Sequence, residues 1–249
     1  MNKLISASGV GMFLLGTSLA FGVMYSSQTL SKALVKMRQD NMIRVKGVSE
    51  EKITSNYATW RCLVSAKSSD LAQAFMKIER SRNSAAEYLK ASGISDGQLS
   101  TGPISTCYEF KHNEKTGEKT NVIENYVLRQ TLEVKSHDVR KIDNISKSVT
   151  DLIKQGIEIS SLPPEYVNLG IEDIKLNLLA KATKNGYERA EILAKNSGGK
   201  VGSLNSASQG VFQITSANST EVDDYGRYDT CSIEKSARAV VTLEFRIEK

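Results

Sequence analysis

The chain has 249 residues, of which 40% are hydrophobic and 24% are charged, and it contains only three prolines. This composition excludes a disordered or proline-rich protein and allows one large globular domain or two small ones. The net charge of +5 comes from 33 basic and 28 acidic residues. Because the two signs are interspersed along the chain, we expect no nucleic-acid partner.

The N-terminal segment is mostly apolar and carries no charge from Leu4 to Tyr25. A helix needs about 20 such residues to cross a bilayer, so this stretch predicts a transmembrane signal anchor within residues 1–31. The alternative is a cleaved signal peptide that ends near the small residues Ser18-Leu19-Ala20. Both interpretations predict export of the remainder, and residues 32–41 form a polar connector.

Two strands follow the connector. Residues 42–48 alternate between apolar and polar, and residues 56–66 are rich in β-forming side chains. With a polar turn at residues 49–52 between them, they predict a β-hairpin. Tyr57 and Trp60 in the second strand are interpreted as packing residues and not as a ligand platform.

The next element is an amphipathic helix that starts after the cap Ser68-Ser69-Asp70 and ends at Gly93. Its apolar stripe consists of Leu71, Phe75, Ile78, Ala85 and Leu89. A strand at residues 104–110, a charged loop at 111–120 and a strand at 123–134 then predict a long hairpin.

A second helix begins at Ser136 and ends at Gly156. Its period predicts a buried face made of Val139, Ile142, Ile145, Val149 and Leu152. Residues 157–167 read as a strand interrupted by Pro163-Pro164. Because proline cannot donate to a strand ladder, we expect an edge strand or a bulge at this point.

A third helix lies within residues 176–202 and carries small side chains on one face. The predicted stripe is narrow enough for close approach to a sheet, and it consists of Leu179, Ala182, Gly186, Ala190 and Leu193. Residues 201–215 and 231–247 predict a final hairpin, joined by the long polar connection 216–230.

The order strand, helix, strand, loop, strand occurs twice, roughly over residues 54–136 and 157–249. We therefore predict an α+β fold made of two related α/β halves, with helices packed on antiparallel or mixed sheets. The N-terminal transmembrane helix precedes this domain, which occupies residues 42–249.

Enzyme signatures are absent from the sequence, including dinucleotide-binding, Walker A, zinc-protease and nucleophile-elbow patterns. The two histidines, His112 and His137, are interpreted as solvated or capping residues and not as general bases. The acidic run Glu221 to Asp224, with Asp229, is interpreted as a solvated loop and not as a cation site. We expect no catalytic residues, no cofactor and no metal; an unrecognised hydrolase is the alternative of lowest weight.

Three cysteines lack zinc-ligand spacing. In an oxidising compartment, one disulfide and one leftover thiol are expected. Cys107 and Cys231 are the candidate pair because each lies beside a polar loop, whereas Cys62 lies in an apolar strand and is expected in the core.

Several stretches together resemble the SIMPL domain family, also called DUF541, which includes exported bacterial proteins. Residues 181–202 (KATKNGYERAEILAKNSGGKVG) are similar to the family's Ala-rich helix that ends in Leu-Ala before closely spaced glycines. Residues 125–134 (NYVLRQTLEV) resemble its Gly-Tyr-x-x-x-x-x-Leu-x-Val strand, with Asn125 in place of the glycine. Residues 45–66 resemble its opening hairpin, except that Asn56-Tyr57 replaces the usual Pro-Asp.

This resemblance covers roughly residues 42–249 and implies a mixed α/β domain in a bacterial extracytoplasmic setting, ring formation in some members, and no set of catalytic residues. The hypothesis that follows is a membrane-anchored protein of the bacterial cell membrane, with its main domain in the periplasm, a structural or interaction role, and assembly into a homo-oligomer. The candidate contacts for this assembly are the edge strands near Pro163-Pro164 and the loops at residues 111–120 and 216–230. The alternative is a small-ligand-binding module in an envelope stress response, which predicts a concave apolar pocket with a few convergent polar groups between the two halves.

Overall fold

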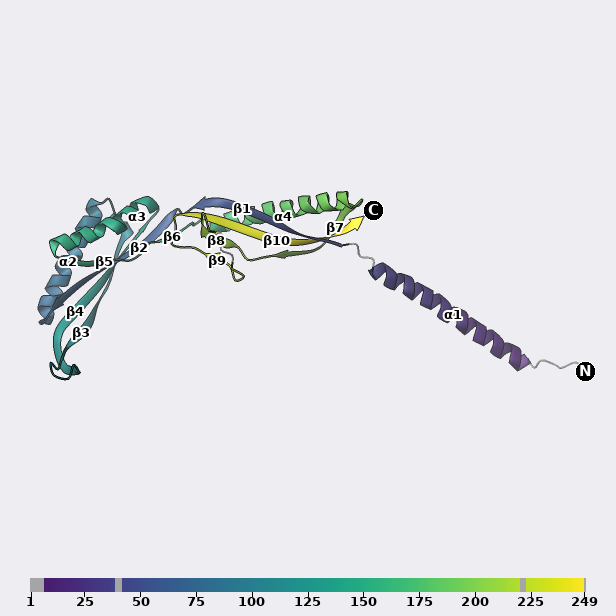
Figure 1. Cartoon of the computed structure of the whole chain (residues 1–249), viewed down its shortest axis with the longest axis horizontal. Coiled ribbons are helices and arrows are strands. Elements are labelled where there is room, and N and C mark those ends of the chain that lie inside the picture. The colour runs from purple at the N-terminus through teal and green to yellow at the C-terminus, as the bar shows by residue number, and fades with distance from the viewer. Residues whose placement is uncertain (1–6, 39–41, 220–222, 249) are drawn as a thin grey trace, which may run out of the picture. The chain divides into compact units, whose positions relative to one another are not determined.

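The computed structural model describes residues 7–38, 42–219 and 223–248. Within them the chain forms an α+β fold of four α-helices and two mostly antiparallel five-stranded sheets (Figure 1). It divides into two compact units. Unit 1 holds residues 1–47, 183–209 and 241–249, and unit 2 holds residues 48–182 and 210–240.

The N-terminal helix α1 spans Ala7–Arg38. Leu4 to Ser6, the first residues of the predicted transmembrane stretch, lie outside the described residues, as do residues 39–41 of the predicted connector. In the part of the chain that the structure describes, no helix combines the length and the apolar character that crossing a membrane requires.

One sheet, called sheet B, lies wholly in unit 2. It contains β2 (Tyr57–Ser68), β3 (Leu99–His112), β4 (Lys119–Ser136), β5 (Glu158–Ser161) and β6 (Glu165–Val167). The order is β3-β4-β2-β5, and β6 also pairs with β2. The β2–β4 register runs without a shift from Ala58↔Ser136 to Ser68↔Tyr126, so residues of even number in both strands share one face.

The even-numbered face of sheet B packs under α2 (Leu71–Ala91), α3 (Val139–Ser148) and the 3₁₀ helix η2 (Val149–Gln155). All five predicted apolar residues of the second helix are buried, so that stripe is confirmed. Gly156 ends the segment with φ 79°, a left-handed conformation that favours glycine. Trp60 is fully buried, and its Nε1 donates to Ser161 Oγ at 3.0 Å, which confirms it as a packing residue.

The predicted stripe of α2 is wrong at its start. Leu71 and Phe75 are 47% and 45% exposed, whereas Ala74 is fully buried with Ile78, Ala85 and Leu89. The small Ala74 side chain lets the first turns approach the sheet closely, and this rotation turns the two larger side chains towards solvent. Asp70 caps the helix as predicted, because its side chain accepts from the N–H of Gln73 at 2.8 Å.

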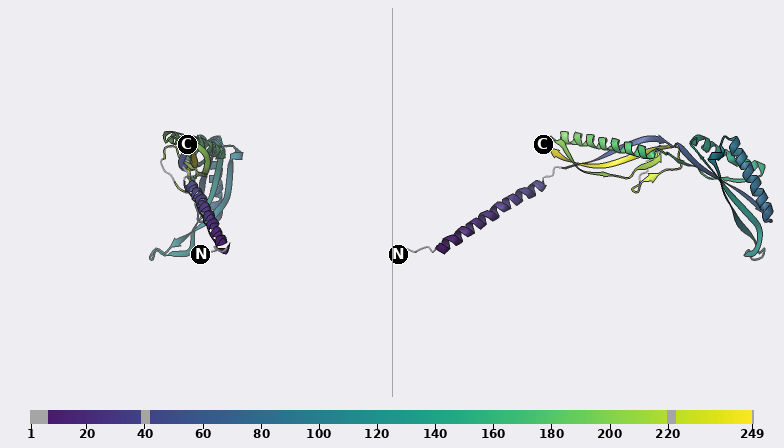
Figure 2. Two further views of the ribbon diagram at one scale, coloured as in Figure 1. Left: turned by 90° about the vertical axis from the view of Figure 1, so that its right-hand side faces the viewer. Right: turned by 180° about the vertical axis from the view of Figure 1, so that it is seen from behind.

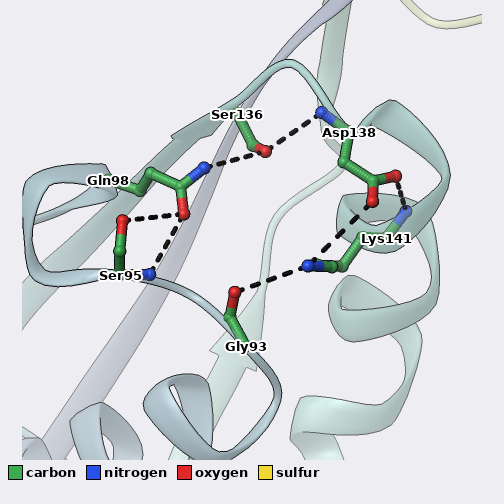
Figure 3. A network of polar contacts seen from close by, with 6 residues as sticks. All are labelled: Gly93, Ser95, Gln98, Ser136, Asp138 and Lys141. Atoms are coloured by element: carbon green, nitrogen blue, oxygen red, sulfur yellow. Dashed lines mark hydrogen bonds and ion pairs between the residues drawn. The ribbon is translucent and has the colours of Figure 1, made fainter.

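A polar network ties the end of α2 to the start of α3 (Figure 3). The 3₁₀ helix η1 (Asp96–Gln98) holds Gln98, whose amide donates to Ser136 Oγ at 3.1 Å. Ser136 Oγ also accepts from the N–H of Asp138 at 3.1 Å, and the Asp138 carboxylate caps α3 through the N–H of Lys141 at 2.9 Å. Asp138 is therefore the N-cap of α3, and the helix begins at Val139, three residues after the predicted start at Ser136.

The second sheet, sheet A, contains β1 (Met42–Thr54), β7 (Lys200–Gln209), β8 (Gln213–Ser216), β9 (Arg227–Tyr228) and β10 (Glu234–Glu248). Its order is β1-β10-β8-β9, and β7 also pairs with β10. β10 pairs antiparallel with β8 and then with β7, which confirms the predicted final hairpin. β8 and β9 form the parallel pair.

The predicted hairpin between the first two strands is wrong, because β1 belongs to sheet A and β2 to sheet B. β1 continues through the predicted turn as far as Thr54. At the crossing point the N–H of Ser55 donates to Ile233 O at 2.9 Å and that of Asn56 to Val167 O at 3.0 Å. These bonds satisfy the backbone where the chain leaves one sheet for the other.

The third helix, α4, spans Ile171–Asn196. Ala182, Gly186 and Ala190 are buried as predicted, but the stripe is completed by Leu178 and Ala194, whereas Leu193 is 51% exposed. Buried positions thus recur every four residues. In unit 1, a Cβ at Gly186 would lie 2.8 Å from Leu243 Cδ1 and 3.3 Å from Gly47 Cα, so the predicted close approach at this glycine is confirmed.

β5 and β6 flank Pro163-Pro164, and both pair with β2 at the edge of sheet B, which confirms the prediction for that stretch. In sheet B, α2 is followed by the edge strand β3 and then by β4, whereas in sheet A the short strands β8 and β9 come between β7 and β10. β4 lies between β3 and β2, and β10 lies between β7 and β1.

Candidate interaction surface on the β3–β4 hairpin

The residues weighed as chemical candidates do not form a site. His112 is exposed at the end of β3, and His137 lies elsewhere, with its ring edge-on to Tyr57 at 5.1 Å. Glu221 and Val222 lie outside the described residues. Within residues 7–38, 42–219 and 223–248, no group of three or more His, Cys, Asp or Glu could hold a metal ion.

The three cysteines are free thiols, with Cys62 buried and Cys107 and Cys231 exposed. Cys107 is aligned through Val127 with Lys67 of β2. Cys231 follows Thr230, whose carbonyl accepts from Tyr166, and Tyr166 is aligned with Ala58. Lys67 and Ala58 are nine residues apart along β2, which corresponds to about 30 Å, whereas a disulfide needs its Cα atoms within about 7 Å. The structure does not bring the candidate pair together.

The buried titratable groups have structural roles. Burial raises the pKa of the Cys62 thiol to about 12, so this thiol stays protonated. Lys235 is 2% exposed and its ammonium donates to the carbonyls of Tyr166, at 2.7 Å, and Asp229. Burial lowers the pKa of Lys235, although the Asp229 carboxylate partly opposes that effect.

The β3–β4 hairpin has one covered and one uncovered end. In the covered end of β4, Leu128, Leu132 and Val134 are buried under the helices. Beyond Tyr126 the register with β2 stops, and the two strands continue past the first turn of α2, which starts at Leu71 just after β2 ends (Figures 1 and 2). In that part of the hairpin, from Lys119 to Glu124, most residues of β4 are exposed.

The uncovered end carries four apolar or aromatic side chains, which we call the hairpin patch: Tyr108, Phe110, Ile123 and Tyr126. Tyr108 lies opposite Tyr126 with ring centroids 5.8 Å apart, and it lies 6.5 Å from Phe110. Phe110 is aligned with Ile123 and lies under the Lys119 ammonium, 4.4 Å from the ring centroid. Tyr108 is 53% and Ile123 39% exposed, whereas Phe110 and Tyr126 are half-buried and Tyr126 also packs against the core. The apolar surface that the patch offers to water is therefore mainly that of Tyr108 and Ile123.

The β3 backbone beside the patch is an open strand edge. Among the described strands, β3 pairs with β4 alone. Monomeric proteins commonly protect such edges with charges, prolines or bulges. β3 has Pro103 and register shifts between Thr101 and Ile104 and on both sides of Phe110, but from Ile104 to Tyr108 it carries no shift, charge or proline.

Charges cluster instead on the other face of sheet B. Glu133 accepts from Arg61 at 2.7 Å and lies 2.8 Å from Lys135. Hydrogen bonds from Lys135 and then Arg61 lower the pKa of Glu133. Farther along the same face, Lys67 pairs with Glu109, and this contact lowers the pKa of Glu109. The hairpin therefore presents one charged face and one apolar face.

The sequence did not reveal the hairpin patch. The alternation that places Tyr126 in phase with Leu128, Leu132 and Val134 is correct, but it does not say how far along β4 the covering helix extends. The available signal was strand length, because the 18 extended residues of β4 are longer than the 21 helical residues of α2.

The family model for SIMPL, described as a protein of unknown function (DUF541), matches residues 43–245. The chain belongs to the SIMPL family. This match spans both sheets and the hairpin patch but leaves α1 outside. No curated protein matches the chain.

Two solved structures give weak likenesses. An amidase of the hydantoinase/carbamoylase family from Burkholderia ambifaria is 8% identical with a TM-score of 0.26, and the match covers 46% of this chain and 28% of that chain. An uncharacterised conserved protein from Listeria innocua is 10% identical with a TM-score of 0.19, and the match covers 78% and 92%. The chain therefore aligns with well under half of the amidase's length.

Proposed function

We propose that this SIMPL-domain protein has a structural or interaction role and assembles into a homo-oligomer through the β3 edge and the hairpin patch. The observation that carries the proposal is the combination of a strand edge that is open from Ile104 to Tyr108 with the exposed side chains of Tyr108 and Ile123 on the same hairpin. Among the described strands of unit 2, none pairs with the outer edge of β3, and Tyr108 and Ile123 stay exposed. No catalytic role is proposed.

A second copy of the chain is the proposed occupant of this edge. Two β3 strands that pair antiparallel about a two-fold axis satisfy the open backbone groups of both. They also place the same surface on each side of the contact, as a closed dimer requires. In such a pairing Tyr108 of each copy lies near the axis, where aromatic side chains contribute most to binding.

Cys107 provides a native reporter of that contact because it is exposed and adjoins Tyr108 on β3. In protein carrying Cys231→Ser, mild oxidation should link two chains through Cys107. The buried Cys62 thiol, with its raised pKa, should not compete. The linked dimer should disappear when Cys107→Ser is added. A chain that stays monomeric on a non-reducing gel after oxidation would contradict the β3 contact.

The proposed setting is the bacterial cell envelope, with the main domain in the periplasm and the N-terminal segment as a membrane anchor. This part rests on the uncharged stretch from Leu4 to Tyr25, whose length suits a bilayer. Membrane fractionation tests it. The full chain should stay in the membrane pellet after a high-salt wash, and Phe13→Arg with Leu15→Arg should release it.

The second candidate is the binding of a small ligand in an envelope stress response. One observation favours ligand binding: a cleft of about 490 Å³ lies beside α2 in unit 2, a volume within the range of small-molecule sites. Its lining is mainly polar, which differs from the apolar pocket expected from the sequence.

A further inference from the structure

The cleft beside α2 exists because β5 is shorter than β2. β5 pairs with β2 only from Cys62↔Ser161 to Ser65↔Glu158, whereas β2 continues to Ser68. On the side of β2 that faces β5, the residues beyond Ser65 therefore have no neighbouring strand. The turn at Gly156 and the flank of α2 form the other walls of the cleft.

Backbone groups of β2 face this cleft. The carbonyl of Arg61 accepts from the N–H of Leu162 at 3.0 Å, on the side of β2 towards β5. Backbone groups of alternate residues point to the same edge, so those of Lys67 do as well. The Lys77 ammonium donates to the Lys67 carbonyl at 3.2 Å, which fixes this cation at the cleft. The N–H of Lys67 points the same way.

The α2 wall supplies polar groups that are available for a ligand. Lys77, Arg80, Ser81 and Ser84 line the cleft, and their spacing of three, four and seven residues places them on one helix face. Arg80, Ser81 and Ser84 make no side-chain hydrogen bond or ion pair among the described residues. Ser81 and Ser84 are half-buried residues and Arg80 is exposed.

The cleft has a net positive charge. Its acidic residue, Glu158, accepts from Ser65 Oγ at 2.8 Å. The Lys67 ammonium is engaged by Glu109 on the other face of the sheet, so Lys77 and Arg80 set the charge that a ligand meets. A planar guanidinium beside an ammonium suits a carboxylate or phosphate, and the two free hydroxyls suit a ligand with hydroxyl groups.

We infer that this cleft binds a small anionic sugar, either a sugar acid or a sugar phosphate, through Lys77 and Arg80 with Ser81 and Ser84. The inference gives the second candidate function a ligand class and rests on that candidate. It does not depend on self-assembly, because the cleft and the hairpin patch share no residue.

Calorimetric titration of the purified full-length protein tests the ligand class, with glucuronate, glucose 6-phosphate and glucose as probes. At least one anionic sugar should bind with a Kd below ~1 mM, and glucose at least about tenfold more weakly. The anion that binds more tightly identifies the sugar acid or sugar phosphate class. Glucose binding as tightly as the anions would overturn the anionic class but leave a ligand-binding role. Failure of all three probes would overturn the anionic-sugar inference.

Variants locate the binding in the cleft. Arg80→Gln and Lys77→Gln should each weaken anion binding by about tenfold. Glu158→Gln should strengthen it, because a repelling carboxylate is removed. Arg82→Gln is the matched control, since Arg82 lies on α2 outside the cleft and pairs with Glu79, and it should stay within about twofold of the parent protein. Equal loss in Arg82→Gln and Arg80→Gln would overturn the location. Oligomer size in the same samples reports separately on self-assembly.

Discussion

The two ends of the β3–β4 hairpin have the same strands and the same ladder but opposite surroundings. At the covered end, Leu132 and Val134 are completely buried beneath α2. At the uncovered end, Tyr108 and Ile123 are in contact with water on the side of the sheet that carries the core. The buried side chains of the covered end therefore stabilise the fold, whereas the uncovered end has apolar surface available for a partner.

The largest effect should come from the covered end. Leu132→Ala removes a fully buried side chain and leaves a cavity, which should lower the free energy of unfolding by about 3 kcal/mol. Denaturant unfolding measures the change. Val122→Ala at the uncovered end, where Val122 is 56% exposed, should change stability by less than about 0.5 kcal/mol. Equal losses in the two variants would break the comparison.

A second packed region, in unit 1, provides an independent measure of close packing. Gly186→Leu inserts a side chain where even a Cβ would lie 2.8 Å from Leu243 Cδ1, and it should destabilise the protein by about 1–3 kcal/mol. Glu188→Leu, at an exposed position of the same helix, is the control and should be nearly neutral. A fully stable Gly186→Leu protein would show that the helix does not need its glycine.

On the charged face of sheet B, the ion pairs of Glu133 should make the free energy of unfolding depend on pH. The lowered pKa of Glu133 means that its ion pairs stabilise the fold above pH 4.5, its ordinary value, and that this contribution is lost as pH falls through the lowered pKa. Glu133→Gln should cost less than about 1 kcal/mol at neutral pH and flatten the acid side of the stability profile. Urea titrations between pH 3 and 7 measure both quantities. An unchanged profile would exclude Glu133 as a contributor.

Sequence periodicity predicted the buried face of a single helix or strand more accurately than the pairing between elements. The stripe from Val139 to Leu152 was correct because a continuous helical period specifies one face. The β1–β2 hairpin was wrong because alternation shows that a strand has two faces but does not identify its neighbour. Leu71 and Phe75 were misplaced because Ala74 can occupy the buried position with a closer approach. The candidate surface depends on how far α2 extends along β4, which only the tertiary structure shows.

The smallest effect on stability should come from the hairpin patch. Tyr108→Lys places a charge on exposed surface at the strand edge and should change the free energy of unfolding by less than about 1 kcal/mol. The same charge should strongly oppose pairing between two copies, since charged side chains protect strand edges. Thermal unfolding and oligomer size, measured on one preparation, separate these effects. Loss of folding together with loss of assembly would show that the patch belongs to the core.

The most direct test of the central claim is the mass in solution of the full-length, detergent-extracted protein, measured by light scattering with the detergent contribution subtracted. The parent chain and Tyr225→Lys, which changes a tyrosine that is 94% exposed outside any strand, should both have the mass of an oligomer at micromolar concentration. Tyr108→Lys should shift towards the 27.3 kDa monomer. A monomeric parent chain, or a Tyr108→Lys protein that assembles as fully as Tyr225→Lys, would contradict assembly through the β3 edge.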